Sequence, residues 1–247
     1  MTIIISRVDE KIKILAVLKD RKKKTILEFF QSIPKKLRDT VISVCSDLYE
    51  GFINSAKEVF GKGIRVVIDR FHVAKLYRKY VDTIRKEELL RLKKELSEEE
   101  YIKLKGLMWG LRKSELSDRE KEVLKIAFKH SAKLKKVYEL ACRLTEILDT
   151  KTTRNGGIRR LRNWISRVKE ASSSYFKTFI GTLEKHIEDI ANYFVERESS
   201  GFVEGFNNRI KVLKRRCYGI VDQVHLFRRI SLDIGGIQVS PVLIHGL

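Results

Sequence analysis

The chain has 247 residues and a formal net charge of +20, from 52 Lys and Arg against 32 Asp and Glu. With 43% hydrophobic residues and only two prolines it is neither disordered nor collagen-like, and it can bury the core of one elaborated domain or two small ones. Such a charge is unusual for a metabolic enzyme and indicates a polyanionic partner, with nucleic acid favoured over an anionic membrane surface.

The sequence offers no sign of a membrane or secreted protein. No stretch approaches the roughly 20 apolar residues of a spanning helix, and the first residues lack the basic segment of a signal peptide. Cys45, Cys142 and Cys217 are scattered without a CxxC spacing, which argues against a disulfide framework or a zinc site. We therefore expect a soluble cytoplasmic protein without a membrane partner.

The N-terminal residues 1–73 predict alternating strands and helices. Residues 3–6 and 12–18 are β-branched and apolar with a polar turn between them, which is typical of a hairpin. Apolar residues at helical spacing predict a helix over residues 25–33, and Pro34 should end it.

A strand, helix, strand pattern follows over residues 41–45, 49–60 and 64–68. Runs this apolar predict a right-handed crossover between buried parallel strands, whose carboxyl ends are the usual place for a site. Each strand is followed by an acid, Asp47 and Asp69. An Asp after a strand can also form a turn or cap a helix, so a structural role stays open for both.

Residues 74–198 are predicted to be helical almost throughout. Proline is absent, and Leu, Lys, Glu and Arg predominate. Breaks near Ser97, Ser117, residues 152–157 and residues 172–174 predict four or five helices. The segment lacks a fixed repeat or sustained heptad, which favours a helical bundle over a coiled coil.

The C-terminal residues 199–234 predict a helix, a break near Tyr218 and Gly219, and a short helix over residues 226–232. The first helix has an apolar stripe that should be buried, made of Val203, Phe206, Ile210 and Leu213. A neighbouring stripe holds Glu204, Asn208, Lys211 and Arg215. Residues 235–247 carry no pattern that predicts a structure.

Two basic stretches are candidates for nucleic-acid contacts. The first holds seven cations and no acid: Lys151, Arg154, Arg159, Arg160, Arg162, Arg167 and Lys169. The second holds Arg209, Lys211, Lys214, Arg215 and Arg216. Either stretch could also be a solvated helix face. The aromatic residues Trp109, Trp164 and Tyr218 could stack on bases, but core packing is the more common role.

Three segments, VCSDLYEGFINSAKEVF, VVIDRFHVAKLYR and SSGFVEGFNNRIKVLKRRCYGI, resemble the DDE transposases of the bacterial insertion-sequence L-three group. The resemblance covers residues 3–234. It implies an α/β fold, a ribonuclease-H-like mixed sheet core with a large all-helical insertion, and an Asp-Asp-Glu triad that holds two Mg²⁺ or Mn²⁺ ions. It also implies hydrolysis at the ends of a DNA element, followed by attack of the freed 3′-hydroxyl on target DNA.

The resemblance assigns two of the three acids. Asp47 matches the second Asp and Glu204 the Glu, both as catalytic residues and metal ligands. The expected DNA contacts are Lys211, Lys214, Arg215, Arg216, Arg159, Arg160 and Arg162. For Asp69 we favour a structural role, capping a helix from Ala74 and pairing with Arg70, and for His72 a packed or DNA-facing position.

The family's first Asp has no clear counterpart. In the family it lies one strand upstream of residues 3–6, and Asp9 with Glu10 falls at the expected hairpin tip, where an exposed turn is favoured. The chain is therefore expected to be inactive alone. The alternatives are a non-enzymatic DNA-binding remnant, a regulator that pairs with itself or with a full-length transposase, and, more weakly, an RNA-binding module.

Overall fold

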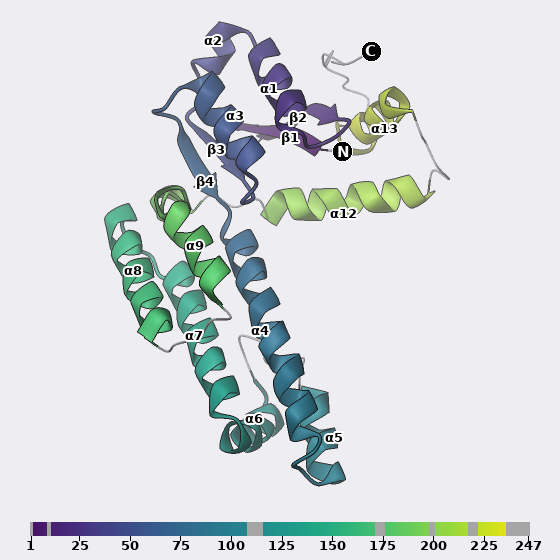
Figure 1. Cartoon of the computed structure of the whole chain (residues 1–247). Helices are drawn as coiled ribbons and strands as arrows, with labels where there is room; N and C mark the ends of the chain where they lie inside the picture. The colour runs from purple at the N-terminus through teal and green to yellow at the C-terminus, as the bar shows by residue number, and fades with distance from the viewer. Residues whose placement is uncertain are drawn as a thin grey trace. The chain divides into compact units, whose positions relative to one another are not determined.

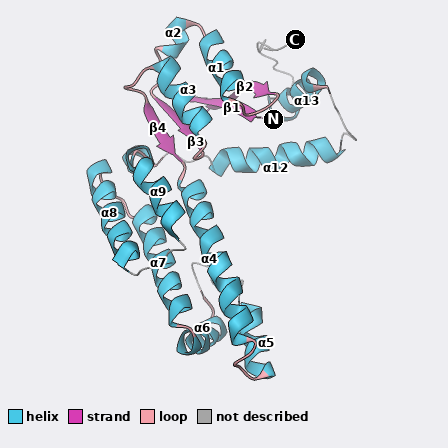
Figure 2. Ribbon diagram, viewed as in Figure 1, coloured by secondary structure: helices cyan, strands magenta, loops and turns pink. Residues whose placement is uncertain are grey.

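The fold is described by a computed structural model (Figure 1), which covers residues 2–8, 11–107, 116–170, 176–197, 201–216 and 222–235. The chain divides into two compact units. Unit 1 comprises Met1–Asp69 and Glu198–Leu247, and unit 2 comprises Arg70–Arg197. Helices predominate, and the described strands lie in unit 1 (Figure 2). The α/β class predicted from the sequence is therefore confirmed.

Unit 1 begins with the predicted hairpin. Strand β1 (Thr2–Val8) pairs antiparallel with β2 (Lys11–Leu18). Ile4 lies opposite Ala16 and Ile5 opposite Ile14, so Leu15 is an extra residue that shifts the register. Asp9 and Glu10, between the strands, lie outside the described residues.

The predicted parallel pair is also present. Strand β3 (Ser43–Ser46) lies beside β4 (Arg65–Ile68), and helix α3 (Glu50–Phe60) connects them. Val66, Val67 and Ile68 of β4 are almost completely buried. Among the described residues, backbone pairing joins β1 to β2 and β3 to β4 as two separate sheets. A single mixed sheet of the ribonuclease-H type therefore stays a prediction.

Helices α1 (Lys23–Ser32) and α3 pack side by side in unit 1 (Figure 1). The rings of Phe30 and Phe60 lie 5.1 Å apart between them, and Lys23 forms a 3.0 Å ion pair with Glu58. Helix α1 ends as predicted, because Ile33 is extended ahead of Pro34, after which the short helix α2 (Lys35–Arg38) begins.

The end of the chain returns to the hairpin. Helix α12 (Gly201–Arg216) contributes Ile210 and Leu213 to a cluster with Leu226 and Ile230 of α13 (Gln223–Gly235). Partly buried hairpin residues pack against this cluster: Ile3, Ile14 and Val17. The two members of the α12 apolar stripe whose side chains are described are thus buried, as predicted.

Unit 2 is helical, and α4 runs along α7 (Figure 1). Its described helices are α4 (Arg70–Leu92), α5 (Glu98–Leu107), α6 (Asp118–His130), α7 (Ala132–Asp149), α8 (Arg154–Glu170), α9 (Lys177–Lys185), α10 (Ile187–Ala191) and α11 (Tyr193–Glu196). No helix in the described ranges has both the length and the apolar character needed to span a membrane.

An aromatic cluster forms the core of unit 2. Tyr77 of α4 stacks on Phe176 with ring centres 5.1 Å apart, and Trp164 meets Phe179 edge-on at 5.9 Å. Tyr77 also donates its hydroxyl to the Val137 carbonyl oxygen, and burial raises the pKa of that phenol. Trp164 is therefore a core residue, while Trp109 and Tyr218 lie outside the described residues.

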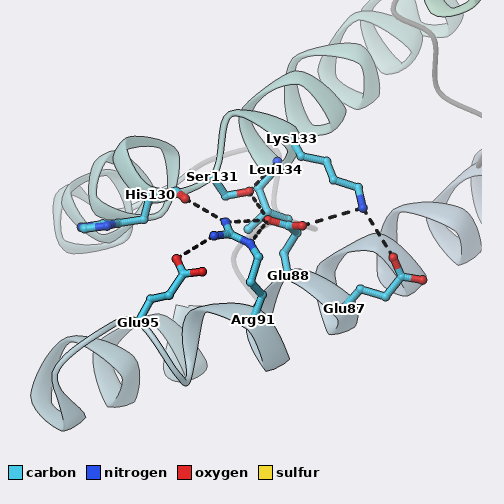
Figure 3. Close-up of polar contacts among 8 residues, drawn as sticks. All are labelled: Glu87, Glu88, Arg91, Glu95, His130, Ser131, Lys133 and Leu134. Atoms are coloured by element: carbon cyan, nitrogen blue, oxygen red, sulfur yellow. Dashed lines mark hydrogen bonds and ion pairs between the residues drawn. The ribbon is translucent and has the colours of Figure 1, made fainter.

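A polar cluster joins α4 to the junction of α6 and α7 (Figure 3). The nearly buried carboxylate of Glu88 accepts hydrogen bonds from the Ser131 hydroxyl at 2.6 Å and from Arg91 at 2.9 Å. Arg91 also donates to the His130 carbonyl oxygen, and Ser131 caps α7. This cluster fixes the end of α4 against the start of α7.

Some helix boundaries differ from the sequence prediction. Helix α4 begins at Arg70, one residue after the end of β4, and not at Ala74. Unit 2 has more than the predicted four or five helices, because the helices also break at Ser131, His186 and Asn192, which the sequence pattern does not mark. Residues 152–157 were expected to form a loop, but α8 starts at Arg154, where Thr153 accepts hydrogen bonds from the N–H groups of Gly156 and Gly157.

Candidate active site and nucleic-acid surface

Asp47 follows β3 at the start of the connection to α3. Its Oδ1 accepts the backbone N–H of Tyr49 at 3.1 Å, which fixes the turn into the helix. Its Oδ2 accepts a hydrogen bond from Arg21 Nη2 at 2.9 Å, and the side chain keeps 27% of its surface exposed. The acid predicted from the sequence is thus partly exposed and paired with a cation.

Asp69 occupies the equivalent place after β4. Its backbone N–H donates to the Ser46 carbonyl oxygen at 3.0 Å, which extends the pairing of the two parallel strands by one residue. Asp69 is 0% exposed, and α4 starts immediately after it. The partner that the structure gives to Arg70 is Asp149. The structural role favoured for Asp69 from the sequence stays a prediction.

Glu204 lies on α12, whose C-terminal half is anchored by Ile210 and Leu213. The Glu204 side chain lies outside the described atoms, so the expected approach of its carboxylate to Asp47 stays a prediction. Asn208, on the same predicted stripe, is exposed.

The predicted DNA contacts lie on two exposed helical surfaces, one in each unit. On α12, Lys211, Arg215 and Arg216 are exposed, and the side chain of Lys214 is not described. On α8, Arg159, Arg160 and Arg162 are exposed, whereas Ile158, Leu161 and Trp164 on the other face are buried. None of these six exposed cations forms an ion pair within the described residues, and their contact with DNA stays a prediction.

Two cations of the α8 stretch have structural partners. Arg154 donates to the Asn192 side chain at 2.7 Å and pairs with Glu188, which ties α8 to the α10–α11 segment. Lys169 pairs with Glu184 of α9 at 2.6 Å. Some cations of this basic stretch therefore hold helices together, whereas others are exposed to solvent, and the sequence does not predict which are which.

The family model of the ISL3-type transposases matches residues 1–230. The chain belongs to this transposase family. It is also similar to the transposase for insertion sequence element IS1001 of Bordetella parapertussis, at 26% identity over 219 residues. The match covers 87% of this chain but 53% of the relative, so the chain spans about half the length of that protein. No solved structure matches the chain.

The described residues of this ISL3-family chain do not by themselves form a metal centre. Within the described ranges, no three His, Cys, Asp or Glu side chains gather closely enough to hold a metal ion. Asp47 has its two carboxylate oxygens engaged by Tyr49 and Arg21. The described residues therefore do not supply a complete set of ligands for a divalent cation.

Arg21 contacts the candidate acid Asp47, and the sequence pattern did not single it out. Arg21 lies between β2 and α1, in a run from Lys19 to Lys24 that extends into the helix and in which five of six residues are cationic. Nothing in the sequence distinguishes Arg21 from its neighbours, because its contact with Asp47 joins residues that lie 26 positions apart.

Proposed function

We propose that this chain supplies part of the catalytic domain of a transposase that cleaves DNA and transfers the cut strand. Asp47 and Glu204 are the proposed catalytic acids, and Mg²⁺ or Mn²⁺ is the proposed cofactor. Family membership supports the reaction class, and the name of the similar transposase supports DNA as the substrate. The proposed core is ribonuclease-H-like, with residues 74–198 as a helical insertion.

The observation that carries this proposal is the parallel pair β3–β4. Neighbouring parallel strands end at the same edge, and in open α/β sheets that edge is where ligands bind. Asp47 follows one of these ends with its carboxylate partly exposed. The rigid strand pair fixes the backbone next to Asp47, which suits a residue that must hold a reacting group in place.

The exposed cations of α8 and α12 support duplex DNA as the partner. Lys and Arg on exposed helix faces bind phosphates and carry no sequence information themselves, so the expected binding has little sequence preference. The proposed assembly is with a second copy or a full-length transposase, which would also supply sequence-specific DNA contacts.

The 247 residues are proposed to be inactive when assayed alone. They provide counterparts for two of the family's three acids, and Asp9 is not expected to replace the third. The effects of removing catalytic acids that act together do not add, so the removal of one acid can reduce activity almost as much as the removal of all of them. The pairing of Asp47 with Arg21 also favours the second candidate function, a DNA-binding regulator without activity of its own.

A nicking assay on supercoiled DNA with Mg²⁺ or Mn²⁺ tests the proposal on three proteins. They are this chain, this chain preceded by a family-type strand that carries Asp-Glu, and the extended chain with Glu204→Gln. We expect that only the second of these proteins nicks DNA. Nicking by the 247-residue chain that Asp9→Asn abolishes would show that Asp9 is the third acid. No nicking by the extended chain, with intact DNA binding, would favour the regulator.

A further inference from the structure

Arg21 is held at Asp47 by two independent contacts. Its Nη2 donates to Asp47 Oδ2 at 2.9 Å, and its guanidinium carbon lies 4.6 Å from the centre of the Tyr49 ring. A guanidinium over an aromatic face gains a cation–π attraction in addition to the charge-assisted hydrogen bond. Arg21 is therefore positioned with a specific geometry, although 55% of its side chain is exposed.

The backbone at the start of α3 is built to hold this aromatic platform. Tyr49 donates its backbone N–H to Asp47 Oδ1, so the ring and the carboxylate belong to one turn. A Cβ at Gly51 would lie 2.3 Å from a ring carbon of Tyr49, which means that the ring occupies the space left by the glycine. Phe52 meets the ring edge-on at 5.9 Å. Gly51 thus permits the ring to support Arg21.

This arrangement affects how a divalent cation could bind to Asp47. Arg21 occupies one acceptor site of Asp47 Oδ2 at 2.9 Å, and its positive charge both compensates the carboxylate and repels a second cation that approaches the same oxygen. We propose that Arg21 is the resident counter-ion of Asp47, and that a divalent cation must displace it before Asp47 can act as a ligand. The inference rests on the proposed function, because it takes Asp47 to be a metal ligand.

The expected size of the effect is modest. Partly exposed ion pairs have coupling free energies that correspond to at most about a fivefold change in an equilibrium constant. Removal of Arg21 should therefore tighten cation binding at Asp47 by about two- to fivefold. A nearby cation that does not contact Asp47 acts only through the screened field, so its removal should change binding much less.

Mn²⁺ binding, measured by electron paramagnetic resonance of the free ion, tests the inference without an activity assay. The proteins are the 247-residue chain and its Arg21→Gln, Lys22→Gln and Asp47→Asn variants. Lys22 is the matched control, because it is exposed and adjacent to Arg21 in the sequence. Among the described residues, its backbone N–H donates a hydrogen bond to the Asp20 side chain. Iron-directed backbone cleavage near residue 47 locates the same site, and circular dichroism checks folding.

We expect Arg21→Gln to bind Mn²⁺ two- to fivefold more tightly, Lys22→Gln to match the parent protein, and Asp47→Asn to weaken binding. Equal effects of the two charge removals, or no effect of Arg21→Gln, would overturn the counter-ion role alone. If Asp47→Asn leaves Mn²⁺ binding and cleavage near residue 47 unchanged, Asp47 is not a ligand, and the proposed function and the counter-ion role are both wrong.

Discussion

Gly157 of α8 lies against the ring of buried Phe194, so that a Cβ at position 157 would come within 2.2 Å of the ring carbon Cδ2. The absence of a side chain therefore allows α8 and α11 to approach closely. The two glycines at the start of α8 suggested a loop from the sequence, yet Gly157 has a packing role within the helix.

Gly157→Ala should destabilise unit 2. Alanine raises helix propensity by about 1 kcal/mol, but displacing a buried ring costs about 1–3 kcal/mol, so we expect a net loss. The matched control is Gly181→Ala in α9, where no atom lies within 4 Å of the new Cβ and a small gain is expected. Urea unfolding followed by tryptophan fluorescence measures both, since Trp109 and Trp164 belong to unit 2. A stabilising Gly157→Ala would contradict the packing role.

Glu88 should contribute stability that depends on pH. Burial opposes its ionisation, but hydrogen bonds from Ser131 and Arg91 prevail and hold the pKa of Glu88 below its usual range. A carboxyl with a lowered pKa stabilises the fold above its unfolded pKa of about 4.3, and this stability is lost as the pH falls through the folded pKa.

Glu88→Gln should therefore lower the free energy of unfolding at pH 7 by about 1–3 kcal/mol and flatten its decline below about pH 4.3. Acid unfolding curves of unit 2 check both effects. In the control Glu99→Gln, an exposed carboxyl loses its pairing with Lys103, and a much smaller change is expected. Equal changes in the free energy of unfolding for the two variants would mean that the cluster in Figure 3 stabilises the fold no more than an exposed ion pair does.

Substitution of Arg154 should affect mainly stability, whereas substitution of Arg160 should affect mainly DNA binding. Arg154→Gln breaks contacts with Asn192 and Glu188 and should lower the free energy of unfolding by about 1–2 kcal/mol, with little effect on DNA affinity. Arg160→Gln removes an exposed cation and should leave stability within about 0.5 kcal/mol while weakening DNA binding. Urea unfolding and fluorescence anisotropy with a labelled duplex measure the two properties. The reverse pattern would contradict the division of the α8 stretch.

DNA affinity should depend strongly on salt. If six to ten cations contact phosphates, log K should fall with log salt with a slope of about −5 to −9. Arg215→Ala with Arg216→Ala should flatten the slope by about one per lost contact. The control removes two cations already paired on other helices, Lys103 of α5 and Lys121 of α6, and should leave the slope unchanged. A slope near zero in the parent chain would rule out phosphate binding.

Local patterns predicted much of the fold. The β-branched runs indicated the hairpin and the parallel strands, and Pro34 marked the end of α1. The sequence could not predict which members of a charged run have partners. Arg154 and Arg160 belong to the same basic helix, and only the position of α10 gives Arg154 its partner Glu188. The contact of Arg21 with Asp47 likewise depends on tertiary structure.

The cluster that joins Ile3 to Ile230 gives unit 1 a long-range topology, because residues from opposite ends of the chain complete one core. Contacts of such high sequence separation form slowly, and domains synthesised earlier fold first. During translation, the contiguous helical unit 2 can therefore fold before unit 1, whose hairpin waits for α13 to leave the ribosome. Truncation before α13 would leave the apolar face of the hairpin uncovered and prone to aggregation.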